Sequence, residues 1–150
     1  MSLLQTGIAA PDFTLADHTG AMRTLSELKG SYVVIYFYPK DDTPGCTKEA
    51  CMIRDIYHDF EKAGITVIGI SKDSPASHAK FREKYELPFI LLSDPEKHAI
   101  GPYGASQLIG TKRISYIIDP NGVIVGVYPN VDPAGHAMQL LQDIKNLQNK

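Results

Sequence analysis

The chain contains two cysteines, Cys46 and Cys51, whose type and spacing suggest thiol chemistry. Cys46 follows Thr43, Pro44 and Gly45, where Thr43 can cap a helix and a proline fits the first helical position. A thiol in the first turn of a helix faces unpaired backbone N–H groups and the positive end of the helix dipole, and both favour the thiolate. Cys46 is therefore a candidate nucleophile.

The charges around Cys46 oppose one another. Asp41 and Asp42 are negative and would by themselves raise the pKa of the thiol, whereas Lys40, Lys48 and the helix terminus act in the other direction. An alternative interpretation is that this cysteine is an inert core residue, as most free cysteines are. The preceding strand, the turn, the Pro-Gly-Cys helix entry and the second cysteine together favour the nucleophile.

The spacing of the two cysteines sets a geometric condition on any bond between them. Residues five positions apart on an α-helix have Cα atoms about 8 to 9 Å apart and side chains about 140° apart around the axis. A disulfide needs Cα atoms closer than about 7 Å. If Cys46 and Cys51 bond, the first helical turns must open, and Pro44 and Gly45 make that turn a plausible place to melt. Alternatively, Cys51 is merely a small helix residue.

A buried strand and an amphipathic helix are expected to position Cys46. Residues 32–38 (YVVIYFY) form an unbroken run of β-branched and aromatic residues, typical of a strand buried on both faces, and Pro39 ends it. After it, apolar residues recur at helical spacing and predict one helix that continues to Gly64. The predicted stripe consists of Cys46, Ala50, Ile53, Tyr57 and Phe60.

The rest of the chain alternates between strand and helix patterns, then ends in a hairpin and a helix. This order predicts an α/β fold with a mixed central sheet and helices on both faces. The other predicted strands are 12–15, 22–24, 65–70, 89–92, 114–118 and 123–128, and the other helices are a single turn at 25–28, 75–85, a short 95–103 and a last one opened by Asp132-Pro133.

Composition and charge exclude several classes of function. A chain of 150 residues, 43% hydrophobic and 21% charged, is expected to form one ordered domain over residues 1–150. A net charge of -2 provides no basic field for nucleic acid. We expect neither a signal peptide nor a membrane span, and hence a cytoplasmic protein in which paired cysteines are catalytic. No metal-binding or nucleotide-binding motif occurs, so no metal site is expected.

The segment from Pro39 to Cys46 (PKDDTPGC) is similar to the active-site signature of peroxiredoxins, in which a proline, a threonine and a cysteine stand at these spacings. The second cysteine five positions later resembles the Q-type branch, also called bacterioferritin comigratory protein. The resemblance covers essentially the whole chain and implies a thioredoxin-like fold of the peroxiredoxin variant. Other segments resemble the family in the expected order: APDFTL at 10–15, KAGITVIGIS at 62–71, LLSD at 91–94 and RISYIID at 113–119.

The resemblance also implies an activity and the residues that carry it. The chain would reduce hydrogen peroxide and organic hydroperoxides through a sulfenic acid on Cys46, which Cys51 resolves as an intramolecular disulfide. Thr43 would orient the peroxide, Pro39 would cover the sulfur, and Arg113 would stabilise the charge that develops on the departing oxygen. The implied reductant is thioredoxin or a similar dithiol protein, and the implied state is a monomer without a cofactor.

Some points stay open at this stage. Glu49 and Arg54 are often present near the cysteine in the family, where they are either helix-surface charges or supports of the site. The connection between Tyr103 and Arg113 is shorter than in many relatives and the chain has no tryptophan, which leaves the substrate preference open. Two rival functions also remain: a thioredoxin-like disulfide exchanger, whose cysteines normally stand three apart, and a redox-sensing binding module.

Overall fold

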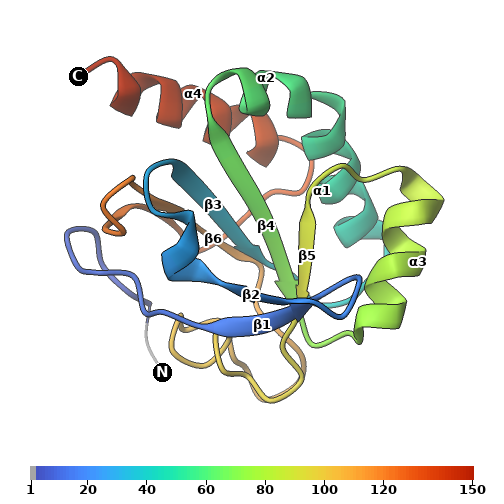
Figure 1. The fold of residues 1–150 in the computed structure, drawn as a ribbon. Helices are drawn as coiled ribbons and strands as arrows, with labels where there is room; N and C mark the ends of the chain where they lie inside the picture. The colour runs from blue at the N-terminus through green and yellow to red at the C-terminus, as the bar shows by residue number, and fades with distance from the viewer. Residues whose placement is uncertain (1–2) are drawn as a thin grey trace.

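A mixed β-sheet forms the centre of the molecule. The computed structural model describes residues 3–150. The strands are β1 (Thr14–Asp17), β2 (Met22–Thr24), β3 (Tyr32–Phe37), β4 (Ile65–Ser71), β5 (Ile90–Ser93), β6 (Ile114–Ile118) and β7 (Ile124–Tyr128). Within the described residues they make a seven-stranded sheet in the order β2-β1-β5-β4-β3-β6-β7 (Figure 1). The pairs β3–β4 and β4–β5 are parallel and the other pairs antiparallel, as the predicted mixed sheet requires.

Strand β3 lies near the middle of the sheet and leads into the helix that carries both cysteines. Residues Val33 to Phe37 are all buried, which confirms the prediction from the unbroken apolar run. Their side chains alternate between two hydrophobic layers: Val34 and Tyr36 face one, and Val33, Ile35 and Phe37 face the other.

The helices are divided unequally between the two faces of the sheet. Those in the described part of the chain are α1 (Pro44–Asp55), α2 (Tyr57–Lys62), α3 (Pro75–Tyr85), α4 (His136–Gln148) and the 3₁₀ helix η1 (Leu25–Leu28). All four α-helices bury residues in the layer that contains Val34 and Tyr36. The opposite layer is closed by η1 and by residues that follow β5. No helix among residues 3–150 combines the length and apolarity that a bilayer span requires.

The single helix predicted up to Gly64 is two helices. The backbone leaves the helical conformation at Ile56, with φ −116° and ψ 15°, and its N–H group bonds to the carbonyls of Ile53 and Arg54. The chain then starts again as α2, which buries Phe60 in the core. The apolar spacing therefore identified the buried residues but could not locate this break.

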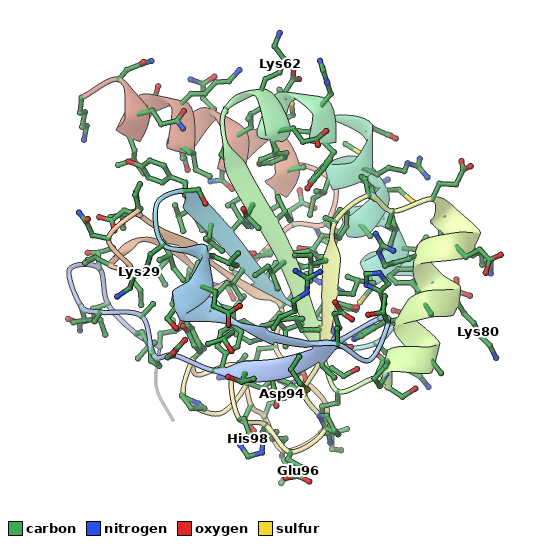
Figure 2. The ribbon with its side chains drawn as sticks, in the orientation of Figure 1. Lys29, Lys62, Lys80, Asp94, Glu96 and His98 are labelled. Carbon is green, nitrogen blue, oxygen red and sulfur yellow. The ribbon has the colours of Figure 1, made fainter. Side chains whose placement is uncertain are left out.

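The short helix predicted at 95–103 is a series of turns. The carboxylate of Asp94 accepts hydrogen bonds from the N–H groups of His98 and Ala99, which folds the chain back on itself after β5. Lys97 adopts a left-handed conformation with φ +61°, and this interrupts any helix. Figure 2 shows Asp94 and His98 on this connection, beyond the end of β5.

The last helix begins later than predicted. Asp132 and Pro133 form a turn, in which the Asp132 carboxylate accepts from the N–H group of Ala134 and its carbonyl accepts from Gly135. Helix α4 starts at His136. An Asp-Pro pair favours a turn as well as a helix start, and here the turn precedes the helix.

Candidate active site

The connection from β3 to α1 holds Thr43 at the N-cap position, but its side chain does not cap the helix. The backbone of Thr43 is extended, with φ −100° and ψ 156°, and Pro44 occupies the first turn as predicted. The Thr43 hydroxyl donates to the carbonyl of Lys40 at 2.8 Å and accepts no bond from a helical N–H group. The predicted side-chain cap is therefore wrong, because the Thr43 hydroxyl is oriented toward the Lys40 carbonyl and not toward a helical N–H group.

Cys46 lies in the first turn of α1 next to a guanidinium group. Its side chain is 2% exposed, and Arg113 Nη2 donates to Sγ at 3.4 Å. Arg113 directly precedes β6, whose antiparallel register sets Ile114 opposite Phe37 at the end of β3. That register brings an arginine 67 positions away in sequence to the helix start. A Cβ atom on Gly45 would lie 3.0 Å from Arg113 Nη2, so the glycine leaves room for this approach.

Glu49 is the second partner of the same guanidinium group. Its side chain is 1% exposed, and Oε1 accepts from Arg113 Nη1 at 2.7 Å. Burial raises the pKa of Glu49 to about 7, although Arg113 acts to lower it. Oε2 has no hydrogen-bond partner among the described residues. Arg113 is thus shared between a carboxyl group and the cysteine sulfur, and Glu49 is not one of the helix-surface charges that the sequence left open.

Pro39 and Arg113 line one open hollow of about 730 Å³ on the surface. Its other lining residues include apolar Leu3 and Val131 and polar Lys112. Arg113 therefore lies both at this hollow and at the cysteine sulfur. The structure brings Pro39, Thr43, Cys46 and Arg113 to one end of β3, where α1 begins.

Cys51 lies on the same helix, off the buried stripe, and is partly exposed. Both thiols are free, and α1 is continuous from Pro44 to Asp55. At this helical spacing the two sulfur atoms cannot bond without opening the helix. The buried residues of α1 are Cys46, Glu49, Ala50 and Ile53, so only one of them is a large apolar side chain.

The other charged residues near Cys46 are held by partners of their own. The Asp41 carboxyl group bonds to Tyr38, Ser77 and His78. Asp42 accepts from Lys84 and from Tyr85, and these bonds lower its pKa. The two negative charges that the sequence set against the thiolate are therefore engaged with α3 and with Tyr38, directly after β3.

Arg54 makes no hydrogen bond to either sulfur within the described part of the chain. Its Nη1 donates to the backbone carbonyl of Tyr85 at 2.8 Å, and its other guanidinium nitrogens bond to Asp55. The role that the sequence left open is therefore a tie between the end of α1 and the end of α3. A long-range backbone acceptor of this kind has no signature in the sequence.

The arrangement suits attack by sulfur on an electrophile that leaves as an anion. A buried thiol at a helix N-terminus has backbone N–H groups and a guanidinium beside it, and both stabilise negative charge. Residues 3–150 contain no group of three or more histidine, cysteine and carboxylate side chains that could hold a metal ion.

Comparisons with known proteins agree with this chemistry. A model of the AhpC/TSA family matches residues 6–127. The chain is 45% identical to a putative peroxiredoxin bcp from Coxiella burnetii, over 92% of this chain and 97% of the relative. It is 48% identical to the chloroplastic peroxiredoxin Q of Oryza sativa subsp. japonica, over 94% of this chain and 67% of the relative. A solved structure of Xylella fastidiosa PrxQ, in a cysteine-to-serine mutant, superposes with a TM-score of 0.94 at 29% identity, over 99% of both chains.

Proposed function

This chain belongs to the AhpC/TSA family, and on that premise we propose that Cys46 is its peroxide-reactive residue and Cys51 its resolving thiol. The chain is a thiol peroxidase of the peroxiredoxin type, with the thioredoxin-like fold of the solved relatives. The observation that carries the assignment of Cys46 is the hydrogen bond from Arg113 to its sulfur in the first turn of α1.

The first step is attack of the Cys46 thiolate on one oxygen of the peroxide. An S–O bond forms, the O–O bond breaks, and the departing oxygen takes a proton to leave as water or an alcohol. The sulfur is oxidised to sulfenic acid. Negative charge on the departing oxygen is met by the Arg113 guanidinium and by the N–H groups of Gly45 and Cys46.

Thr43 and Pro39 would shape the approach of the peroxide. Because the Thr43 hydroxyl donates its hydrogen to the Lys40 carbonyl, its oxygen lone pairs are free to accept the O–H of a bound peroxide. Pro39 lines the same hollow as Arg113 and would limit access of water to the sulfur.

The second step is attack of the Cys51 thiolate on the sulfenic sulfur. An S–S bond forms and the hydroxyl leaves as water after protonation, so that the peroxide's two electrons have come from two thiols. The first turns of α1 must open for the sulfurs to meet. A dithiol protein of the thioredoxin type would then reduce the disulfide by exchange, and α1 would form again.

The substrates would be hydrogen peroxide and organic hydroperoxides. The bacterioferritin comigratory protein of Xanthomonas campestris has alkyl peroxide reduction activity, and its solved structure has a TM-score of 0.88 and 32% identity to this chain. The apolar side chains in the hollow beside Arg113 suit an alkyl substituent. We also propose that the protein is a cytoplasmic monomer. Size-exclusion chromatography would test the monomeric state.

Mass spectrometry after one equivalent of hydrogen peroxide tests the two cysteine roles. The wild-type chain is expected to lose two hydrogens as the disulfide forms, whereas Cys51→Ser is expected to gain one oxygen as a sulfenic acid. Cys46→Ser should consume no peroxide. Equal peroxide consumption by Cys46→Ser and wild type would contradict the proposal and favour a disulfide exchanger or a redox-sensing module.

A further inference from the structure

Helix α3 contacts the chain on both sides of the segment that must open. The contacts before α1 are made by Asp41 and Asp42, and the contact after the cysteines is made by Arg54. Figure 1 shows α3 beside α1 at one end of the sheet. These contacts differ in burial and in chemistry.

The first contact is a group of four side chains, Tyr38, Asp41, Ser77 and His78, which we call the Asp41 cluster; all but the half-buried Ser77 are buried. Asp41 Oδ1 accepts from the Tyr38 hydroxyl at 2.5 Å, and Oδ2 accepts from the Ser77 hydroxyl at 2.8 Å. His78 Nδ1 lies 2.7 Å from the same Oδ2, and the His78 side chain is fully buried. Two residues of α3 therefore fix the carboxyl group that precedes α1.

The hydrogen bonds of His78 require a proton between it and Asp41. Nε2 lies 2.9 Å from the carbonyl of Leu92 on β5, and a carbonyl only accepts, so Nε2 carries a hydrogen. Nδ1 and Asp41 Oδ2 then share one further proton. The backbone N–H of Asp41 also donates to Asp73 at 2.9 Å. The connection before α1 is thus bonded to α3 and to the residues that follow β3 and β4, and indirectly to β5.

The second contact lies at the surface, one residue later. Asp42 holds a left-handed conformation with φ +57°, and its carboxylate accepts from Lys84 Nζ at 2.8 Å and from the Tyr85 hydroxyl at 2.6 Å. This conformation is uncommon for residues other than glycine, although aspartate adopts it more readily than most, and here the two bonds hold the side chain in place. The last turn of α3 therefore fixes the backbone two residues before Pro44.

The third contact joins the other end of α1 to the same turn of α3. Arg54 Nη1 donates to the Tyr85 carbonyl, one of the carbonyls that a helix leaves without an internal partner at its C-terminus. Tyr85 thus contacts the chain before the cysteines through its hydroxyl and after them through its carbonyl.

We propose that α3 is a fixed frame for the resolving step, and that the opening of α1 is confined to residues 43–53 between Asp42 and Arg54. This inference rests on the proposed disulfide between Cys46 and Cys51. With both ends held, the opened segment remains a short loop whose ends stay in place, which keeps Cys51 near the sulfenic acid and returns the chain to register after reduction. Asp41, His78 and Arg54 are then positioning residues for the second step, without contact to the peroxide.

Hydrogen-exchange mass spectrometry on the reduced and the disulfide forms tests the frame. On oxidation, amides of residues 47–53 should lose protection, while those of the Asp41 cluster, α3 and α2 keep it. Intact mass is measured on the same samples. If no disulfide forms, the proposed function fails. If the disulfide forms but protection is also lost across α3, or in the connection at 39–42, the frame is wrong.

Variants at each surface contact sharpen the test. In Arg54→Met the loss of protection should extend past residue 54 into α2, and disulfide formation should be about two- to threefold slower, because the opened loop that carries Cys51 is longer. In the double variant Lys84→Met, Tyr85→Phe, the loss of amide protection should extend back to residues 39–42. The rate of sulfenic acid formation should not change in either protein.

Lys80→Met is the matched control, since Lys80 lies on α3 and Figure 2 shows its side chain pointing away from the sheet. The control should exchange and react as wild type. An exchange pattern in Arg54→Met that equals that of the control would overturn the inference. A general loss of stability would instead raise exchange throughout the protein, including the central strands, so it is distinguishable from a local effect.

Discussion

Helices α1 and α3 are nearly equal in length, with 12 and 11 residues, but they are held in opposite ways. Helix α3 is capped at its start, where the Ser74 side chain accepts from the N–H group of Ser77, and it ends at Glu86 in a left-handed conformation. Helix α1 has no side-chain cap, begins with Pro44 and Gly45, and breaks at Ile56. The comparison supports our proposal that α1 opens during turnover, whereas α3 keeps its helical structure.

The largest expected effect comes from removing the sulfur of α1. Cys46→Ser should lower peroxide reduction by at least about a thousandfold, because nothing replaces the nucleophile. Cys51→Ser is the matched control and should keep the first attack while losing turnover with thioredoxin. The measurement is peroxide consumption in single-turnover and steady-state assays. Normal thioredoxin-dependent turnover in Cys51→Ser would assign resolution to another thiol.

The next effect comes from the guanidinium that reaches the first turn of α1. Arg113→Met should lower kcat/KM for hydrogen peroxide by about 100- to 1000-fold, as expected for the loss of a donor to developing charge. Arg113→Lys should recover only part, because an ammonium cannot bond to the sulfur and to Glu49 in the same fork.

Arg82→Met on α3 provides the contrast to Arg113→Met. Arg82 donates to the backbone carbonyl of Phe89, so its loss should lower stability and leave the peroxide step unchanged. Equal loss of kcat/KM in Arg82→Met and Arg113→Met would mean that Arg113 has no special role in the peroxide step.

Glu49 gives α1 a stability that depends on pH. The unfolded chain releases the proton of Glu49 near pH 4.5 and the folded chain near pH 7, so the folded state binds more protons between these values. The free energy of unfolding therefore falls as pH rises from 4.5 to about 7, by at most about 3 kcal/mol from this group.

Glu49→Gln cannot titrate, so its stability relative to wild type should rise over that pH range and level off above it. Urea denaturation at pH 5 and pH 8 measures the change. A difference between the two proteins that is the same at both pH values would show that the carboxyl group does not carry the raised pKa.

The smallest effects compare the two helix starts directly. Ser74→Ala should lower the free energy of unfolding by about 1 kcal/mol, because it removes a side-chain cap. Thr43→Ala should cost less than that, since its hydroxyl bonds to the Lys40 carbonyl at the surface and not to a helical N–H group. Chemical denaturation of both variants decides the order, and a larger loss in Thr43→Ala would reverse the comparison.

Local signals in the sequence were sufficient for α3 but not for α1. Ser74, Pro75 and the apolar spacing predicted α3 with the bounds that the structure has. For α1 the start was predicted and the end was not, because the break at Ile56 depends on how the following residues pack into the core. Strand β3 was predicted because burial on both faces leaves an unbroken apolar run.

The residues of the candidate site likewise fall into those that the sequence predicted and those that it did not. The candidate nucleophile followed from helix-start chemistry, and the assignment of Arg113 followed only from the family resemblance. The pairing of Glu49 with Arg113 joins residues 64 positions apart, and that of Asp41 with His78 joins residues 37 apart. Contacts at such separations are made by the register of strands and the packing of helices, so periodicity along one segment cannot reveal them.

The small residues on the inner face of α1 affect how much apolar surface this helix exposes when it opens. Ala50 and Cys46 face the core, with Ile53 as the one large hydrocarbon among the buried residues of this helix. The buried side chains of α1 itself therefore expose little apolar surface when the helix opens. If turnover opens α1 as we propose, this helix contributes little apolar surface through which the open form could associate with neighbouring proteins.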